Sequence, residues 1–179
     1  FHSTGTDYLA PFVNRVLQKL YPEMEIQFTR RNITVNEWGR IDQFPAINLQ
    51  VSDNGNSIDA YNPHFALNEA KLSAIAISIF LGAIIKQSPF SPNLKPLFLD
   101  DILIGLDNEN RLKLLNLLKE KDVPEADKVF KHFQIFITTY DRHWYEVAKI
   151  NLPGWKFIEF YKSADGPKVI HNDKTNLEK

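Results

Sequence analysis

The chain has 179 residues, of which 44% are hydrophobic and 24% are charged, as in an ordinary globular domain. Its formal net charge of −1 gives no overall basic field for nucleic acid, although a local basic patch is not excluded. There is no cysteine, which excludes disulfides and thiolate metal sites and fits a reducing cytoplasm. The most apolar stretch, residues 74–85, is too short to span a bilayer, so we expect a buried helix and no membrane partner.

The first 62 residues predict a helix and then a small antiparallel β region. The helix covers residues 7–20, where apolar side chains recur at helical spacing and Pro11 falls in the first turn. Tyr21-Pro22 ends it, because the residue before a proline avoids the helical conformation. Asp53 to Asn56 has the sequence of a tight hairpin turn. Short strands are expected at residues 23–29, 46–52 and 56–60.

From residue 63 onward, helices and strands alternate. The order from Pro96 is strand, helix, strand, helix, strand, which predicts an α/β fold with a mainly parallel sheet and flanking helices. The first two strands are continuous apolar runs, which is typical of strands buried on both faces. We expect a frayed tail after Ser163. The expected helices are residues 68–86, 109–121 and 142–149, and the expected strands are residues 96–100, 133–138 and 155–161.

Polar side chains gather where the predicted parallel strands end. Asp100 and Asp101 follow the first strand, and residues 138–141 follow the second. In parallel sheets, chemistry gathers at the carboxyl ends of the strands. One aspartate there can anchor a magnesium ion, and a second acid beside it can orient or deprotonate an attacking water. A solvated turn after a core strand is the alternative interpretation of this pair.

Three stretches together resemble the C-terminal lobe of ABC-type ATPase heads, most of all the SMC/RecN/RecF-like group. They are LNEAKLSAIAISIFLG (residues 67–82), PLFLDDILIGLD (96–107) and FQIFITTYDRHW (133–144). The resemblance implies a partial P-loop NTPase fold for residues 63–179, with residues 1–62 as the re-entry from a missing upstream lobe or coiled coil. It also implies ATP and Mg²⁺ as cofactors, a second head in an ATP-dependent dimer, and a role in DNA repair, chromosome maintenance or phage defence.

Carried over by position, the resemblance assigns roles to the residues around the second stretch. Asp100 matches the Walker B aspartate that supports the magnesium ion. Asp101 matches the catalytic base that follows it, where glutamate is frequent, and its shorter side chain predicts slow turnover. Gly105-Leu106-Asp107 matches the D-loop, which signals across the dimer of heads.

The signature motif of the family, commonly LSGGQ, falls on residues 67–71, with sequence LNEAK. Asn68 stands at the serine, Ala70 at the second glycine and Lys71 at the glutamine. In the family, the serine and the glycine bind the γ-phosphate of the partner head. Ala70 is bulkier than glycine, and the positive charge of Lys71 is expected to compensate. Tyr140 falls at the switch histidine but cannot carry protons near neutral pH. The alternatives are a plain helix cap for Asn68, a solvated lysine for Lys71 and simple packing for Tyr140.

The phosphate loop that such a site needs is absent from this sequence. None of the seven glycines is followed by lysine, so the motif G-x-x-x-x-G-K-[ST] does not occur. The expected partner is therefore an N-terminal Walker A lobe, from the same full-length chain or from a separate subunit. The isolated chain is expected to be inactive as an ATPase.

Two other classes of function stay open at this point. A degenerate lobe kept for binding a partner would explain the altered signature motif. In a Toprim-like nuclease, Asp100, Asp101 and Asp141 would hold magnesium, although no further acidic set completes that pattern. Arg30, Arg31 and Arg40 are candidates for contact with DNA phosphates, and a solvated sheet edge is the alternative.

Overall fold

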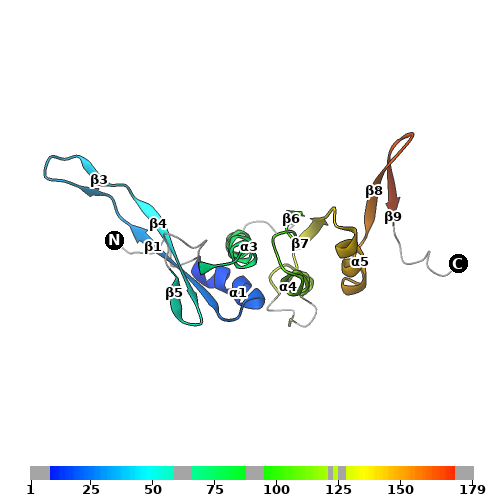
Figure 1. Cartoon of the computed structure of the whole chain (residues 1–179), viewed down its shortest axis with the longest axis horizontal. Helices are drawn as coiled ribbons and strands as arrows, with labels where there is room; N and C mark the ends of the chain where they lie inside the picture. The colour runs from blue at the N-terminus through cyan, green and yellow to red at the C-terminus, as the bar shows by residue number, and fades with distance from the viewer. Residues whose placement is uncertain (1–8, 59–65, 88–94, 121–122, 125–127, 172–179) are drawn as a thin grey trace. The chain divides into compact units, whose positions relative to one another are not determined.

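The computed structural model describes residues 9–58, 66–87, 95–120, 123–124 and 128–171. These residues form two compact units, one ending at Thr138 and the other beginning at Thr139. Figure 1 shows their helices and strands. The predicted boundary between residues 62 and 63 lies outside the described residues. No helix in the described ranges is both long and apolar enough to cross a membrane.

The N-terminal part of the first unit combines one helix with an antiparallel sheet, as predicted. Helix α1 (Ala10–Leu20) has its proline in the first turn. At the β4–β5 turn, Asn54 and Gly55 have φ values of 51° and 76°, the left-handed pair that a tight type I′ hairpin requires. The sheet has the order β1-β4-β5, and a separate antiparallel pair joins β2 and β3. These strands are β1 (Met24–Arg31), β2 (Thr34–Val35), β3 (Ile41–Gln43), β4 (Ala46–Asp53) and β5 (Asn56–Ile58).

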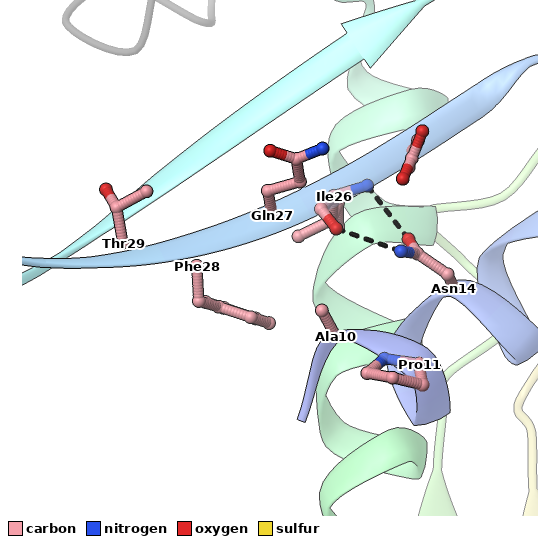
Figure 2. Close-up of a pocket in the computed structure, with 8 residues that line it drawn as sticks. Ala10, Pro11, Asn14, Ile26, Gln27, Phe28 and Thr29 are labelled. Atoms are coloured by element: carbon pink, nitrogen blue, oxygen red, sulfur yellow. Dashed lines mark hydrogen bonds between the residues drawn. The ribbon is translucent and has the colours of Figure 1, made fainter. Parts of the chain in front are cut away.

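A side-chain amide ties α1 to the outer edge of β1 (Figure 2). The backbone N–H of Ile26 donates to Asn14 Oδ1 at 2.8 Å, and Asn14 Nδ2 donates to the carbonyl of Ile26 at 2.9 Å. The amide of Asn14 therefore satisfies the two backbone groups that a neighbouring strand would otherwise bind. Beside it lies a groove of about 390 Å³ between the first turns of α1 and residues 25–29.

Helix α3 (Glu69–Lys86) packs closely on α1. Val13 of α1 and Leu81 of α3 are fully buried. A Cβ atom added at Gly82 would lie 2.8 Å from the backbone nitrogen of Val13, so only glycine allows this approach. The 3.6-residue periodicity of α1 and the nearly continuous apolar surface of α3 together produce the main core.

The one parallel pair among the described residues joins β6 (Lys95–Asp100) and β7 (Phe133–Thr138), in register from end to end. Helix α4 (Asn108–Lys119) connects them in sequence. Leu97 and Leu99 are buried, whereas Phe98 is 66% exposed and stacks on Phe136 at 4.6 Å between ring centroids. The expectation that both faces of these strands are buried is therefore wrong for the described residues, because only one face is covered.

The second unit contains α5 (Arg142–Asn151) and an antiparallel hairpin of β8 (Ile158–Ser163) and β9 (Gly166–His171). The α/β character of the chain is confirmed, but the prediction of a mainly parallel sheet is wrong. Three of the four described sheets are antiparallel. The third predicted strand pairs with β9 because a turn at residues 164–165 brings that segment back beside it, and the expected frayed tail is β-strand as far as His171.

The approach of α3 to α1 predicts that Gly82→Ala destabilises the fold. Alanine normally stabilises a helix by about 1 kcal/mol over glycine. Here its Cβ would meet Val13, and such overpacking costs roughly 1–3 kcal/mol. Urea unfolding followed by circular dichroism should show a lower midpoint. Ala76→Gly, at an exposed position of the same helix, measures the difference in helix propensity between alanine and glycine without any overpacking. A raised midpoint in Gly82→Ala would contradict this account.

Candidate functional site

The carboxyl end of the parallel pair brings three oxygen-bearing side chains to one place. Asp100 is the last residue of β6, and the hydroxyl of Thr138 on β7 donates to its Oδ1 atom. The backbone N–H of Asp101 donates to the carbonyl of Thr138 at 3.2 Å. The in-register pairing of Asp100 with Thr138 therefore positions both aspartates.

Asp101 combines two properties that bear on its role. Its φ of 52° lies in the left-handed region, which costs a non-glycine residue roughly 1–2 kcal/mol. Its Oδ1 atom is buried and has no hydrogen-bond partner in the described part of the chain. Burying a carboxylate oxygen without a partner is unfavourable, so this atom is suited to bind a water or a ligand. The strand ends one residue earlier, at Asp100, as the expected bounds of residues 96–100 predicted.

These groups fit a magnesium ion that is shared with a nucleotide. Two carboxylates and a hydroxyl are hard oxygen ligands, and Mg²⁺ in phosphate-transfer sites uses one or two carboxylates plus water and substrate phosphates. Within the described ranges, no group of three acidic, histidine or cysteine side chains could hold a metal by itself. Asp141, the third residue of the nuclease alternative, caps α5 by accepting from the N–H of Trp144 at 3.2 Å.

The loop after Asp101 is held rigidly against the helices. A Cβ added at Gly105 would lie 2.3 Å from Ser73 Oγ and 2.9 Å from its Cβ, so glycine is needed at this contact with α3. The guanidinium of Arg111 donates to the carbonyls of Leu106 at 2.8 Å and Ile104 at 3.2 Å. The predicted D-loop thus packs closely against Ser73 of α3 and is hydrogen-bonded to Arg111 of α4.

Asp107 caps α4 and also binds the end of α1. Its Oδ1 accepts from the N–H of Asn110 at 2.9 Å, and its Oδ2 accepts from Asn110 Nδ2 at 2.8 Å. Tyr21 Oη donates to the same Oδ2 at 2.9 Å. Burial alone would raise the pKa of Asp107, but these hydrogen bonds from Asn110 and Tyr21 hold it below its usual value. Burial, followed by the neighbouring Asp107, raises the pKa of Tyr21.

The predicted signature segment forms the N-terminus of α3. Asn68 Oδ1 accepts from the N–H of Lys71 at 2.9 Å, which confirms Asn68 as a helix cap. Ala70 is half-buried in the first turn. Lys71 forms an ion pair with Asp53 at the end of β4, and its Nζ lies 5.7 Å from the centroid of the Tyr21 ring. The alternative of a freely solvated lysine is therefore wrong.

Tyr21 was not predicted from the sequence as part of the site, and neither was the contact between Thr138 and Asp100. Tyr21 contacts both Lys71 and Asp107, yet the sequence shows it only as the residue before a proline that ends a helix. Thr138 was placed at a strand end, but its bond to Asp100 depends on the pairing of β6 with β7. Tyr140 belongs to the second unit, where its side chain is 77% exposed, and its role stays a prediction.

The lowered pKa of Asp107 predicts an acid-dependent loss of stability. The ionised carboxylate stabilises the fold above its ordinary pKa near 3.8, and this contribution is lost as pH falls through the lower folded value. Asp107→Asn keeps a good cap but removes the charge. Between about pH 5 and pH 2, urea unfolding should therefore show a larger loss for the wild type than for Asp107→Asn. Asp141→Asn, the same change at the cap of α5, is the control, and equal losses in wild type and Asp107→Asn would contradict the assignment.

No protein-family model and no curated protein matches the sequence. Solved structures do match. An SMC ATPase described for ATP-driven dimerization and DNA-stimulated activation is 16% identical, with a TM-score of 0.59 over 94% of this chain and 86% of that chain. An SMC head bound to the C-winged helix domain of ScpA is 18% identical, with a TM-score of 0.61 over 93% of this chain and 43% of that one.

A third similar structure is the SMC head of Pyrococcus furiosus with an extended coiled coil, bound to the C-terminal domain of ScpA. It is 17% identical, with a TM-score of 0.57 over 94% of this chain and 35% of that one. The chain thus spans less than half the length of both ScpA-bound heads. The described residues have an SMC-like ATPase head fold.

Proposed function

We propose that this chain is the C-terminal part of an ATP-hydrolysing SMC/RecF-like head. The observation that carries the proposal is the buried Oδ1 of Asp101, which has no partner among the described residues. It lies next to Asp100 and Thr138 at the end of a parallel pair. A buried carboxylate oxygen without a partner and a left-handed non-glycine residue are both costly, and both occur at functional sites. The SMC-like fold supports the same proposal.

Each residue at this edge has a role in the proposed reaction. Asp100, oriented by the hydroxyl of Thr138, holds the magnesium ion through an oxygen or a bound water. Asp101 orients the attacking water and accepts its proton. When bound, the magnesium ion neutralises charge that develops on the β- and γ-phosphates. The tight turn at Asp101 keeps this carboxylate at the strand end despite its short side chain.

The rest of the nucleotide site is supplied by an N-terminal Walker A lobe, in the same full-length chain or in a separate subunit. The sequence contains no phosphate loop to grip ATP. Phe98 and Phe136 form an exposed aromatic pair on the face of β6 and β7 that no described residue covers. Exposed apolar clusters of this kind are typical of surfaces that another segment covers, which supports the presence of a further lobe.

The proposal includes a second head in an ATP-dependent dimer. Asn68, Ala70 and Lys71 occupy the N-terminus of α3, where backbone amides and the helix dipole favour a phosphate. Lys71 would exchange Asp53 for the γ-phosphate of the partner head. One similar structure is described for ATP-driven dimerization and DNA-stimulated activation, which supports this arrangement.

The biological setting belongs to the same proposal. We expect a cytoplasmic protein of DNA repair, chromosome maintenance or phage defence. Arg30, Arg31 and Arg40 are exposed on the hairpin formed by residues 24–53 and are available for contact with DNA phosphates.

A non-catalytic interaction lobe is the second candidate, and the ion pair between Lys71 and Asp53 favours it. A lysine that is already partnered inside the fold has a structural role without any phosphate. Ala70 adds bulk where the family has glycine. In that case the carboxylates at the end of β6 would bind magnesium weakly and turn over no ATP.

Asp101→Asn tests the catalytic assignment. Asparagine tolerates the left-handed conformation, so the fold is retained. We expect ATP hydrolysis by the chain combined with its Walker A lobe to fall at least about 100-fold, because proton transfer to Asp101 is lost. Asp42→Asn, at an exposed acid on β3, should leave the rate unchanged. Robust turnover by Asp101→Asn would show that the assignment is wrong. Robust turnover by the isolated chain would instead contradict the need for a Walker A lobe.

Lys71→Gln distinguishes the proposed ATPase from the alternative of a non-catalytic interaction lobe. We expect ATP-dependent dimerisation to weaken about tenfold, because a charge-assisted bond to phosphate is lost. Lys86→Gln, in the last turn of the same helix, is the matched control. Sedimentation velocity of the chain combined with its Walker A lobe, with and without ATP, measures the change. Unchanged dimerisation in Lys71→Gln would instead support the interaction lobe.

A further inference from the structure

We propose that Tyr21 is a positioning residue that fixes Asp107 and Lys71, the predicted D-loop and signature residues, in one arrangement at the end of α1. Nothing in the resemblance to ATPase heads assigns a role to this tyrosine. Its importance for ATP turnover rests on the proposed function, whereas the arrangement itself is a property of this chain.

The backbone of Tyr21 is held on both sides. Its N–H donates to the carbonyl of Leu17 at 2.8 Å, and its carbonyl accepts from the N–H of Met24 at 3.1 Å. At the adjacent Leu20, the carbonyl accepts from Lys113 Nζ of α4 at 3.1 Å. The side chain of Tyr21 therefore leaves a rigid corner between α1 and β1, and its direction is set by the fold.

The hydroxyl of Tyr21 completes the bonding of Asp107. Oδ2 of Asp107 accepts from this hydroxyl at 2.9 Å and from Asn110 Nδ2 at 2.8 Å. The Tyr21 bond joins segments 86 residues apart in the chain, whereas the Asn110 bond is local to the first turn of α4. The hydroxyl of Tyr21 thus binds the side chain of Asp107 directly to the end of α1.

The ring of Tyr21 has a separate contact with the signature segment. Lys71 Nζ lies 5.7 Å from the ring centroid, within the range of a cation–π interaction. The same ammonium group binds Asp53 at the β4–β5 turn. A phosphate that drew Lys71 away from Asp53 would also remove the cation from the Tyr21 ring. Conversely, a shift of the end of α1 would move Tyr21, and with it the positions of Lys71 and Asp107.

The two contacts use different parts of one side chain, so substitution can separate them. Tyr21→Phe removes the hydroxyl bond to Asp107 and keeps the ring below Lys71, while Tyr21→Leu removes both. Tyr145→Phe is the matched control, because its ring also lies below a lysine, with Lys149 Nζ at 5.4 Å, and it belongs to the second unit.

The first experiment uses this chain alone. Carbon-13 NMR titration should show the pKa of Asp107 rising toward its ordinary value near 3.8 in Tyr21→Phe and staying unchanged in Tyr145→Phe. Hydrogen exchange at the N–H groups of Ile104 and Leu106 should speed up about tenfold in Tyr21→Phe. The N–H of Lys71, which binds Asn68, should exchange faster only in Tyr21→Leu. An unchanged pKa and unchanged exchange in Tyr21→Phe would overturn the proposal.

The second experiment adds the Walker A lobe and measures ATP turnover. Tyr21→Phe should lower kcat about tenfold with little change in KM, because a misplaced D-loop impairs signalling between heads and not binding of nucleotide. If the wild-type assembly turns over no ATP, the proposed function fails, and the titration and exchange results still decide the arrangement around Tyr21. If the wild type is active and Tyr21→Phe has the same kcat, the positioning role in turnover is overturned.

Discussion

The antiparallel packing of α1 on α3 sets the positions of the groups around the candidate site. Near one end of the contact, Val13 and Gly82 bring the two backbones together without an intervening side chain. At the other end, the Tyr21 ring lies below Lys71, and the Tyr21 hydroxyl binds Asp107. The loop at Gly105 depends on the same pair, since it contacts Ser73 on α3.

The carboxyl end of β6 has several features, each of which by itself lowers the stability of the fold. Asp101 has a left-handed backbone and a buried oxygen without a partner in the described part of the chain, and Asp100 lies beside it. Surrounding contacts offset these costs, including the bonds from Thr138 and the carbonyls held by Arg111. Departures from local preference that the rest of the fold sustains are typical of functional sites. The proposed water-positioning role of Asp101 agrees with this pattern.

Most helices and strands of the first unit could be predicted from the sequence, because periodicity and turn chemistry act locally. The Asn54-Gly55 turn, the proline in α1 and the cap at Asn68 each depend on a few neighbouring residues. The partners of strands were predicted less well. An alternating run at residues 155–161 fits either a parallel sheet or a hairpin, and the return of β9 after a short turn decides between them. Likewise, the apolar composition of β6 does not reveal that the Phe98 face lacks cover in the described residues.

Residue types and their spacing were enough to locate the acidic strand end, the capped helix and the glycine-containing loop along the chain. They were also enough to show that the sequence contains no phosphate-loop motif. The folded arrangement was needed to show that Thr138 binds Asp100 and that Lys71 is paired with Asp53. It was also needed to show that Asp101 has an oxygen without a partner in the described part of the chain. It also placed Tyr21 beside Asp107, 86 positions away. Hydrogen bonds and burial depend on distances through space, which spacing along the chain does not encode.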